Sequence, residues 1–215
     1  MKIITLTVTL LLSLAAVAQT DDAAKAKEIL NKVSAKTRQY QSIKADFSFS
    51  LENLQDNIKE NHDGSILLKG NKYRIALMGV INYFDGKTLY TWMKEAEEVN
   101  VSEPDMTDES TLNPASIFTI YEKGFKLKYV GEKNVGGKMM HEIDLYPENR
   151  DKPFSRIKLT INKETLQINS FMQQGKDGNN YTITVKNMQT NVPATDGDFI
   201  FNKTANPKVQ VIDLR

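Results

Sequence analysis

The chain has 215 residues, with 28 Lys and Arg against 27 Asp and Glu, and no cysteine. This near-neutral charge, without a basic run, excludes nucleic acid and anionic membrane surfaces as main partners, and the lack of cysteine excludes disulfides and thiol catalysis. A chain of this length favours one domain with a sizeable core.

Residues 1–18 have the three parts of a secretory signal peptide. Lys2 forms the positive region, residues 3–16 the apolar region, and Ala16 with Ala18 suits a small-residue cleavage site. The alternative, a membrane anchor, is disfavoured because the apolar run is shorter than the roughly 20 residues that span a bilayer. A lipoprotein signal would need a cysteine after the cleavage point. We therefore expect an exported, soluble and unlipidated protein, cleaved after Ala18, whose single domain spans residues 19–215.

Residues 23–40 are predicted to form an amphipathic helix that Asp21 or Asp22 caps. Apolar residues at helical spacing make up one face: Ala26, Ile29, Leu30, Val33 and Tyr40. From Ala45 to Glu52 apolar and polar residues alternate, which predicts a strand with one solvated face. Such a strand favours an antiparallel sheet, because parallel sheets are covered on both faces.

The stretch from Gly64 to Trp92 has the densest strand pattern and the only tryptophan. Residues 70–71 separate two alternating runs, and residues 85–86 separate two more. Because Asp85 and Gly86 tolerate positive φ, we expect a tight type I′ turn there. The stretch therefore predicts four strands joined as hairpins.

A short apolar helix is predicted from Asn113, as N-cap, to Gly124. Beyond it, turn residues separate further strands, which span residues 125–130, 139–146, 154–161, 166–173, 181–189 and 199–201. Two helices and about 10 to 11 strands predict a mainly β protein with a strongly curved antiparallel sheet or partial barrel.

Residues able to carry catalysis or bind a metal are few. His62 and His141 are far apart in sequence, and neither has a second ligand at metal spacing. We interpret His62 as part of a solvated turn and His141 as a satisfied interior histidine.

Two pairs of carboxylates have a spacing that suits acid–base chemistry: Asp144 with Glu148, and Asp105 with Asp108. Charged residues on strands and loops are usually solvated, so we expect neither pair to be catalytic. The sequence also has no nucleophile elbow, P-loop or glycine-rich dinucleotide turn. We expect a protein that is not an enzyme and has no metal and no cofactor.

Aromatic and aliphatic residues recur along the predicted strands. A curved sheet lined by them and covered by apolar helices encloses either a packed core or a hydrophobic cavity. We favour a lipid-sized cavity, because an open half-barrel leaves more apolar surface than one helix pair fills.

Motifs along nearly the whole mature chain resemble those of the periplasmic outer-membrane lipoprotein carrier family, the LolA-like proteins. The N-terminal helix leads into a strand with Phe47, and residues 64–75 are similar to the family's Gly-x-Leu-x-x-Lys-Arg-Pro-x-x-Phe-Arg-Trp segment. Residues 85–90, Asp-Gly-Lys-Thr-Leu-Tyr, resemble the family's next hairpin. The remaining matches are Asn113, Pro114, Ile117 and Phe118 for the lid helix, and Phe199, Phe201, Pro207 and Val211 for the C-terminal pattern.

The resemblance implies an incomplete, open antiparallel β-barrel of about 10 to 11 strands, covered by N-terminal and lid helices around a hydrophobic cavity. It implies a carrier that receives the acyl chains of lipoproteins from an inner-membrane ABC lipoprotein exporter, shields them, and delivers them to the outer membrane, where an acceptor protein is a further expected partner. A monomer is expected.

The residues that we expect to line the acyl-chain cavity are Leu30, Val33, Phe47, Phe49, Ile66, Leu68, Tyr73, Ile75, Leu77, Tyr90, Trp92, Ile117 and Phe118. The family's lid-locking arginine and its following proline fall on Lys69 and Gly70. Lysine keeps the charge but loses the planar five-donor fork. Two interpretations of Lys69 therefore stay open, a lid latch and a solvated lysine at a turn.

Two other classes of function remain. One is a periplasmic lipid- or lipoprotein-binding sensor or scaffold with the same fold, which a separate second domain would favour. The other is an envelope hydrolase, which would need a cluster of buried polar residues around His141 or a carboxylate pair. The sequence shows no convincing cluster of this kind.

Overall fold

The computed structural model describes residues 22–104, 120–122 and 124–215. The predicted signal peptide lies outside the described residues, and so does most of the second predicted helix, with Ile117 and Phe118. No helix in the described part of the chain is long and apolar enough to cross a membrane.

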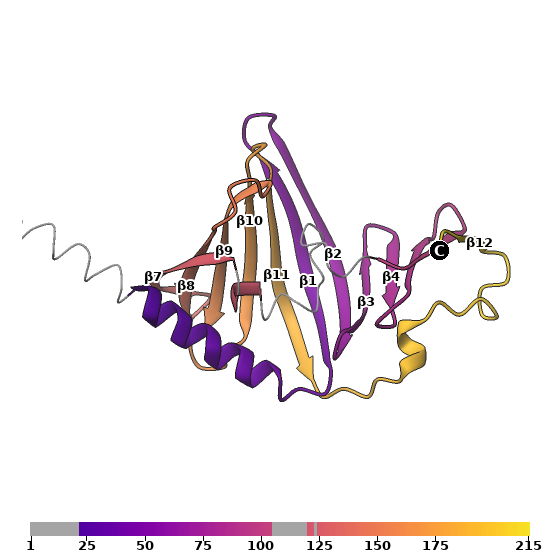
Figure 1. The fold of residues 1–215 in the computed structure, drawn as a ribbon, viewed down its shortest axis with the longest axis horizontal. Helices are drawn as coiled ribbons and strands as arrows, with labels where there is room; N and C mark the ends of the chain where they lie inside the picture. Colours follow the sequence, from indigo (N-terminus) through magenta and orange to yellow (C-terminus); the bar gives the residue numbers. More distant parts are fainter. Residues whose placement is uncertain (1–21, 105–119, 123) are drawn as a thin grey trace, which may run out of the picture.

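Twelve strands form one sheet in the order β12-β6-β5-β4-β3-β2-β1-β11-β10-β9-β8-β7 (Figure 1). The strands are β1 Ile43–Asn53, β2 Ile58–Lys69, β3 Lys72–Leu77, β4 Val80–Phe84, β5 Leu89–Met93, β6 Glu98–Ser102, β7 Phe125–Val135, β8 Lys138–Pro147, β9 Phe154–Asn162, β10 Ile168–Gly175, β11 Asn180–Thr190 and β12 Gln210–Asp213. All pairs are antiparallel except β12 with β6. Because the two end strands, β7 and β12, do not pair with each other, the sheet is an open half-barrel, as predicted.

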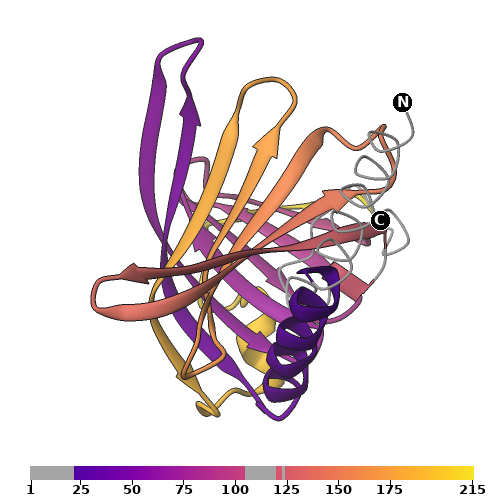
Figure 2. The ribbon, with the colours of Figure 1, turned by 90° about the vertical axis from the view of Figure 1, so that its left-hand side faces the viewer.

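The N-terminal helix spans residues 22–37 and ends three residues earlier than predicted. After it, the amides of Gln39 and Tyr40 bond to carbonyls three residues back, at Lys36 and Thr37, so the last turn tightens and the helix stops. Its apolar stripe is buried against the part of the sheet formed by β7–β10. Figure 2 shows the helix on the side toward which the sheet curves.

The sheet has two faces, which the strand register defines, because directly opposed residues in antiparallel pairs share a face. We call the face that carries the N-terminal helix the helix face and the other the outer face. One row on the helix face runs across six strands through Ile143, Leu159, Phe171, Ile183, Phe49 and His62. The helix covers the part of the helix face that β7–β10 form.

The C-terminal segment, residues 191–209, lies against the outer face. Phe201 and Val209 pack with Val99 and the partly buried Tyr83 and Trp92 of β4–β6. The predicted strand at residues 199–201 is wrong, because Phe199 is the last residue of a 3-10 helix, η3 (Asp196–Phe199), and residues 200–201 do not join the sheet. Thr195 donates from its backbone N and from Oγ1 to Asp198 Oδ2, each at 2.8 Å, and these bonds favour a tight turn over an extended chain.

The hairpin turns match the prediction in part. Residues 70–71 join β2 to β3 as expected, but the tight turn with positive φ at both central residues lies at Met78 and Gly79, with φ of 51° and 77°. Asp85 instead opens a four-residue loop. Its Oδ1 accepts bonds from the amides of Lys87 and Thr88 at 2.9 and 2.8 Å. The expected type I′ turn at residues 85–86 is therefore wrong, because the aspartate side chain caps a longer loop.

Candidate functional site

Apolar side chains continue along the helix face beyond the edge of the N-terminal helix. In the row across the sheet, Ile143, Leu159 and Phe171 lie under the helix and are 0%, 1% and 5% exposed. Farther along the same row, Ile183 of β11 and Phe49 of β1 are only partly buried. The same apolar face is thus packed at one end and accessible at the other.

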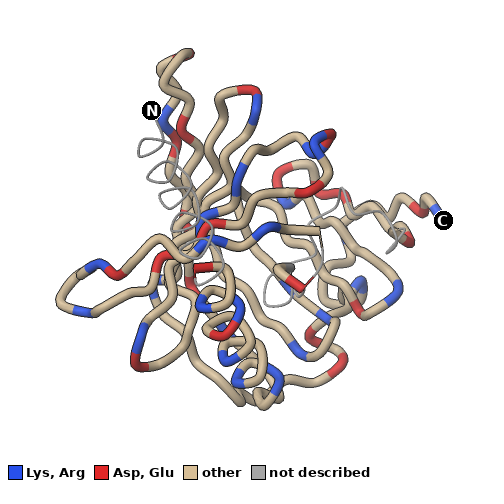
Figure 3. The backbone as a smooth tube through the Cα atoms, turned by 60° about the vertical axis from the view of Figure 1, so that its left-hand side comes forward, with Lys and Arg blue, Asp and Glu red and all other residues tan. Residues whose placement is uncertain are grey.

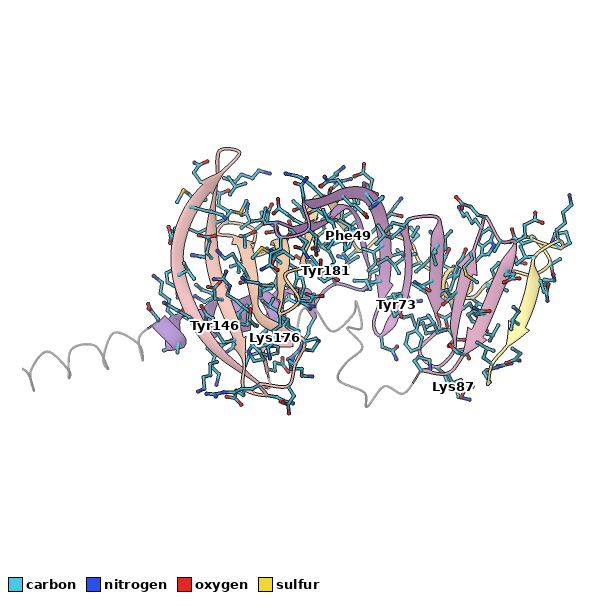
Figure 4. All side chains as sticks on the ribbon, turned by 90° about the horizontal axis from the view of Figure 1, so that it is seen from above. Phe49, Tyr73, Lys87, Tyr146, Lys176 and Tyr181 are labelled. Atoms are coloured by element: carbon cyan, nitrogen blue, oxygen red, sulfur yellow. The ribbon has the colours of Figure 1, made fainter. Side chains whose placement is uncertain are left out.

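Phe47 and Gly64 form a close contact at the centre of this accessible part. They are opposed in β1 and β2, and Phe47 is 4% exposed. A Cβ at residue 64 would meet the Phe47 ring at 2.4 Å, so only glycine lets this ring lie flat across β2. Beside it, Phe49 stacks with Tyr181 of β11, with ring centroids 6.3 Å apart. Figure 4 shows Phe49 and Tyr181 together near the middle of the sheet.

The surface extends over β2, β3 and β4. Ile66 and Ile75 are opposed and partly buried, and Leu77 lies next to them across from Gly64. At the far end of these strands, Tyr73 contacts Phe84, with ring centroids 5.2 Å apart. The candidate site is this apolar surface of the helix face, formed by Phe47, Phe49, Ile66, Leu68, Tyr73, Ile75, Leu77, Tyr181 and Ile183. Within it Phe47 and Leu68 are buried, and the other members are partly buried.

Most of the predicted cavity residues lie together on this surface, but four of the described ones are placed elsewhere. Leu30 and Val33, each 1% exposed, are packed between the helix and the sheet. Tyr90 and Trp92 lie on the outer face, where Trp92 contacts Phe201 with ring centroids 5.4 Å apart. The period-2 pattern placed Tyr90 and Trp92 on one face of their strand, but the sequence did not show which face it was.

Sequence reasoning missed Tyr181 and Ile183 as members of the site. They alternate with polar Thr182 and Thr184, which is the signal that could have indicated one apolar face on β11. Their place beside Phe49 depends on the pairing of β11 with β1, which are far apart in the sequence.

Lys69, the predicted latch, lies on the outer side of the β2–β3 turn. Its Nζ donates to the carbonyl of Ala194 at 3.1 Å and forms an ion pair with Asp196 Oδ1 at 3.3 Å. Lys72 also reaches Asp196 Oδ1, at 3.1 Å. Lys69 thus bonds to the C-terminal segment. A role as a lid latch stays a prediction, because the lid helix lies mostly outside the described residues.

Both histidines lie on strands. His62 is in β2, opposite Phe49 on the helix face, so its interpretation as part of a turn is wrong: β2 begins earlier than its apolar pattern indicates. His141 is 8% exposed, and its Nδ1 lies 3.3 Å from Tyr129 Oη and 3.6 Å from Glu132 Oε1. Burial lowers the pKa of His141 below its usual 6.5, which agrees with an interior, neutral histidine.

Asp144 is not solvated, in contrast to its interpretation from the sequence. It is 3% exposed, accepts a bond from Arg156 Nη1 at 3.0 Å, and accepts another from Tyr146 Oη at 3.2 Å. The cross-strand arginine gives the buried carboxylate a partner, and Glu148 is exposed. The described residues contain no group of three His, Asp or Glu that could hold a metal ion. Figure 3 shows charges of both signs distributed along the chain.

Comparison with known proteins gives a family and a fold. The family model for the outer membrane lipoprotein carrier protein LolA matches residues 14–176. No curated protein matches the chain. Among solved structures, an uncharacterized conserved protein from Thermus thermophilus has a TM-score of 0.58 and 13% identity, covering 88% of this chain and 99% of that chain. A DUF1329 family protein from Desulfovibrio piger has a TM-score of 0.50 and 11% identity, covering 83% and 97%. At these identities the likeness concerns the fold alone.

Proposed function

The chain belongs to the family of the outer membrane lipoprotein carrier protein LolA, and from this membership we propose that it is a periplasmic carrier of acylated lipoproteins. In this proposal the protein takes lipoproteins from an inner-membrane ABC exporter, shields their acyl chains, and passes them to an acceptor at the outer membrane. The acyl chains lie on the accessible apolar surface of the helix face. The proposal includes export and removal of residues 1–18.

The observation that carries the proposal is the change in burial along one row of the helix face. Side chains under the helix are fully packed, whereas Phe49 and Ile183 in the same row remain partly exposed. Apolar surface that a protein leaves accessible on a concave face is typical of a binding site. Acyl chains that lie on the apolar side chains beyond the helix are therefore removed from water.

Carriage of this kind needs no bond chemistry. Burial of apolar area contributes about 25 cal/mol per Å², so affinity grows with the length of acyl chain that the surface covers. A surface formed by partly exposed side chains releases its cargo more readily than a closed core would, because less area is lost from water.

The test is extraction of a lipoprotein by the purified protein from detergent or membranes. We expect recovery of the acylated form and not of the same lipoprotein without acyl chains. Ile75→Asp should reduce recovery at least tenfold, because a carboxylate on the apolar surface cannot be buried without a partner.

The matched control is Val211→Asp, which makes the same kind of change at an exposed position of β12, away from the helix face. Equal recovery of the acylated and unacylated forms would exclude the carrier. Capture of the acylated form without delivery to outer-membrane vesicles would favour the sensor or scaffold.

A further inference from the structure

A hollow of about 570 Å³ lies on the outer face, between the sheet and the start of the C-terminal segment. Its floor comes from β11 and β1–β4, and Val192, Pro193 and Asp198 of the C-terminal segment form one wall. This volume is within the range of roughly 300–1,000 Å³ that is usual for small-molecule sites. The hollow is on the opposite side of the sheet from the surface proposed for acyl chains.

One cross-strand row forms the floor of the hollow. Register places Gln189, Lys44, Leu67, Arg74 and Tyr83 side by side on β11, β1, β2, β3 and β4. Neighbouring strands lie about 4.8 Å apart, so Lys44 and Arg74 are separated by about 10 Å with Leu67 between them. Two long cationic side chains thus flank one apolar residue and can converge above it.

The two cations are available to a ligand. Within the described ranges, neither Lys44 nor Arg74 has a hydrogen bond or an ion pair. Arg74 is partly buried, whereas Lys44 is exposed. A guanidinium that is partly withdrawn from water and has no paired anion favours binding of a carboxylate or phosphate.

The nearby carboxylates do not neutralise Lys44 and Arg74. Asp198 Oδ2 accepts both bonds from Thr195, and these bonds, with a smaller contribution from the charge of Arg74, lower the pKa of Asp198. Asp196 pairs with Lys69 and Lys72. Asp46 is two residues along β1 from Lys44, is exposed, and does not line the hollow. One lining carboxylate therefore faces two cations, and the hollow keeps a net positive charge.

The remaining lining residues are mostly apolar. Ala76 and Ile81 lie in the next cross-strand row, and Val192 and Pro193 face them from the C-terminal segment. We propose that the hollow binds an amphiphile with one anionic head group, whose carboxylate or phosphate is held by Arg74 and Lys44 while its apolar chain lies along Ala76 and Ile81. This site does not depend on the proposed carriage of lipoproteins on the helix face.

Trp92 provides a specific reporter for the test. It is the only tryptophan of the chain, and it is directly opposed to Ile81 on the outer face. The purified protein is titrated with dodecanoate, dodecyl phosphate and the neutral dodecyl maltoside, each below its micelle concentration, while Trp92 emission is recorded. We expect saturable changes with both anionic amphiphiles and at least tenfold weaker binding of the neutral one.

Arg74→Gln and Lys44→Gln should each weaken anionic binding about tenfold, because each removes one charge-assisted contact. The control Lys138→Gln removes one positive charge at an exposed position of β8 and should leave binding unchanged. The stronger of the two anionic ligands identifies the head group as a fatty-acid carboxylate or a lipid phosphate. Equal binding of dodecyl maltoside, or unchanged binding to the Arg74→Gln/Lys44→Gln double variant, would overturn the proposal, whatever the result of lipoprotein extraction.

Discussion

At the scale of single residues, Gly64 determines the shape of the proposed acyl surface. Its missing side chain leaves the space that the Phe47 ring occupies, and a Cβ there would also lie 2.9 Å from the carbonyl oxygen of Ala76. The sequence identified this glycine as the start of the hairpin stretch. Its close contact with Phe47 could not be predicted, because it depends on the register between β1 and β2.

We predict that Gly64→Ala destabilises the protein by about 1–3 kcal/mol, the usual cost of overpacking, and displaces the Phe47 ring. Urea unfolding measures the first effect and lipoprotein extraction the second. Gly197→Ala is the matched control, since its new methyl group would meet only Thr195 Oγ1, at 3.8 Å. Wild-type stability of Gly64→Ala would show that the ring relaxes without cost.

At the scale of elements, the C-terminal segment is held to the outer face by two kinds of contact. Asp196 pairs with Lys69 and Lys72 at its start, and Phe201, 7% exposed, packs against Tyr83 and Trp92. The ion pairs are substantially exposed, so solvent screening leaves each of them a small contribution to stability. Burial of the phenylalanine should therefore dominate the attachment.

We predict that Phe201→Ala lowers the free energy of unfolding by about 3–5 kcal/mol, whereas Asp196→Asn lowers it much less. Urea unfolding followed by Trp92 emission measures both. Asp196→Asn should still increase hydrogen exchange of the amides around η3, because the segment opens locally there. An equal loss of stability in the two variants would contradict this ranking.

The elements also show how far the sequence determines the fold. Alternation of apolar residues and the turn residues at 70–71 were sufficient for the hairpins, since these features are local. The faces of Tyr90 and Trp92 were not predictable, because the C-terminal segment that covers them is distant in sequence. The strand expected at residues 199–201 was wrong for a related reason. Phe199 and Phe201 are two residues apart and apolar, as in a strand, but both are buried by a segment that contains a 3-10 helix and does not pair with the sheet there.

At the scale of the whole molecule, stability should fall with acid in two steps. Carboxylates whose pKa is lowered by their partners, such as Asp196 beside Lys72 and Asp213 beside Arg215 with a pKa of about 2, favour the folded state above their unfolded pKa values. Their contribution is lost as pH falls below about 4. His141 acts at higher pH. Burial lowers its pKa below 6.5 in the folded protein, although Glu132 opposes this effect.

As pH falls, His141 is protonated near pH 6.5 in the unfolded chain, but only at lower pH in the folded protein. The free energy of unfolding therefore decreases as pH falls below about 6.5 and levels off below the folded pKa of His141. Lys163, Lys25 and Lys32 also face this site and lower the pKa of His141 further. We predict that His141→Gln, which cannot be protonated, removes the decrease that begins as pH falls below about 6.5 and leaves the step below about pH 4 unchanged. Urea unfolding at a series of pH values measures both steps. An unchanged profile for His141→Gln would show that the interior histidine is protonated without cost.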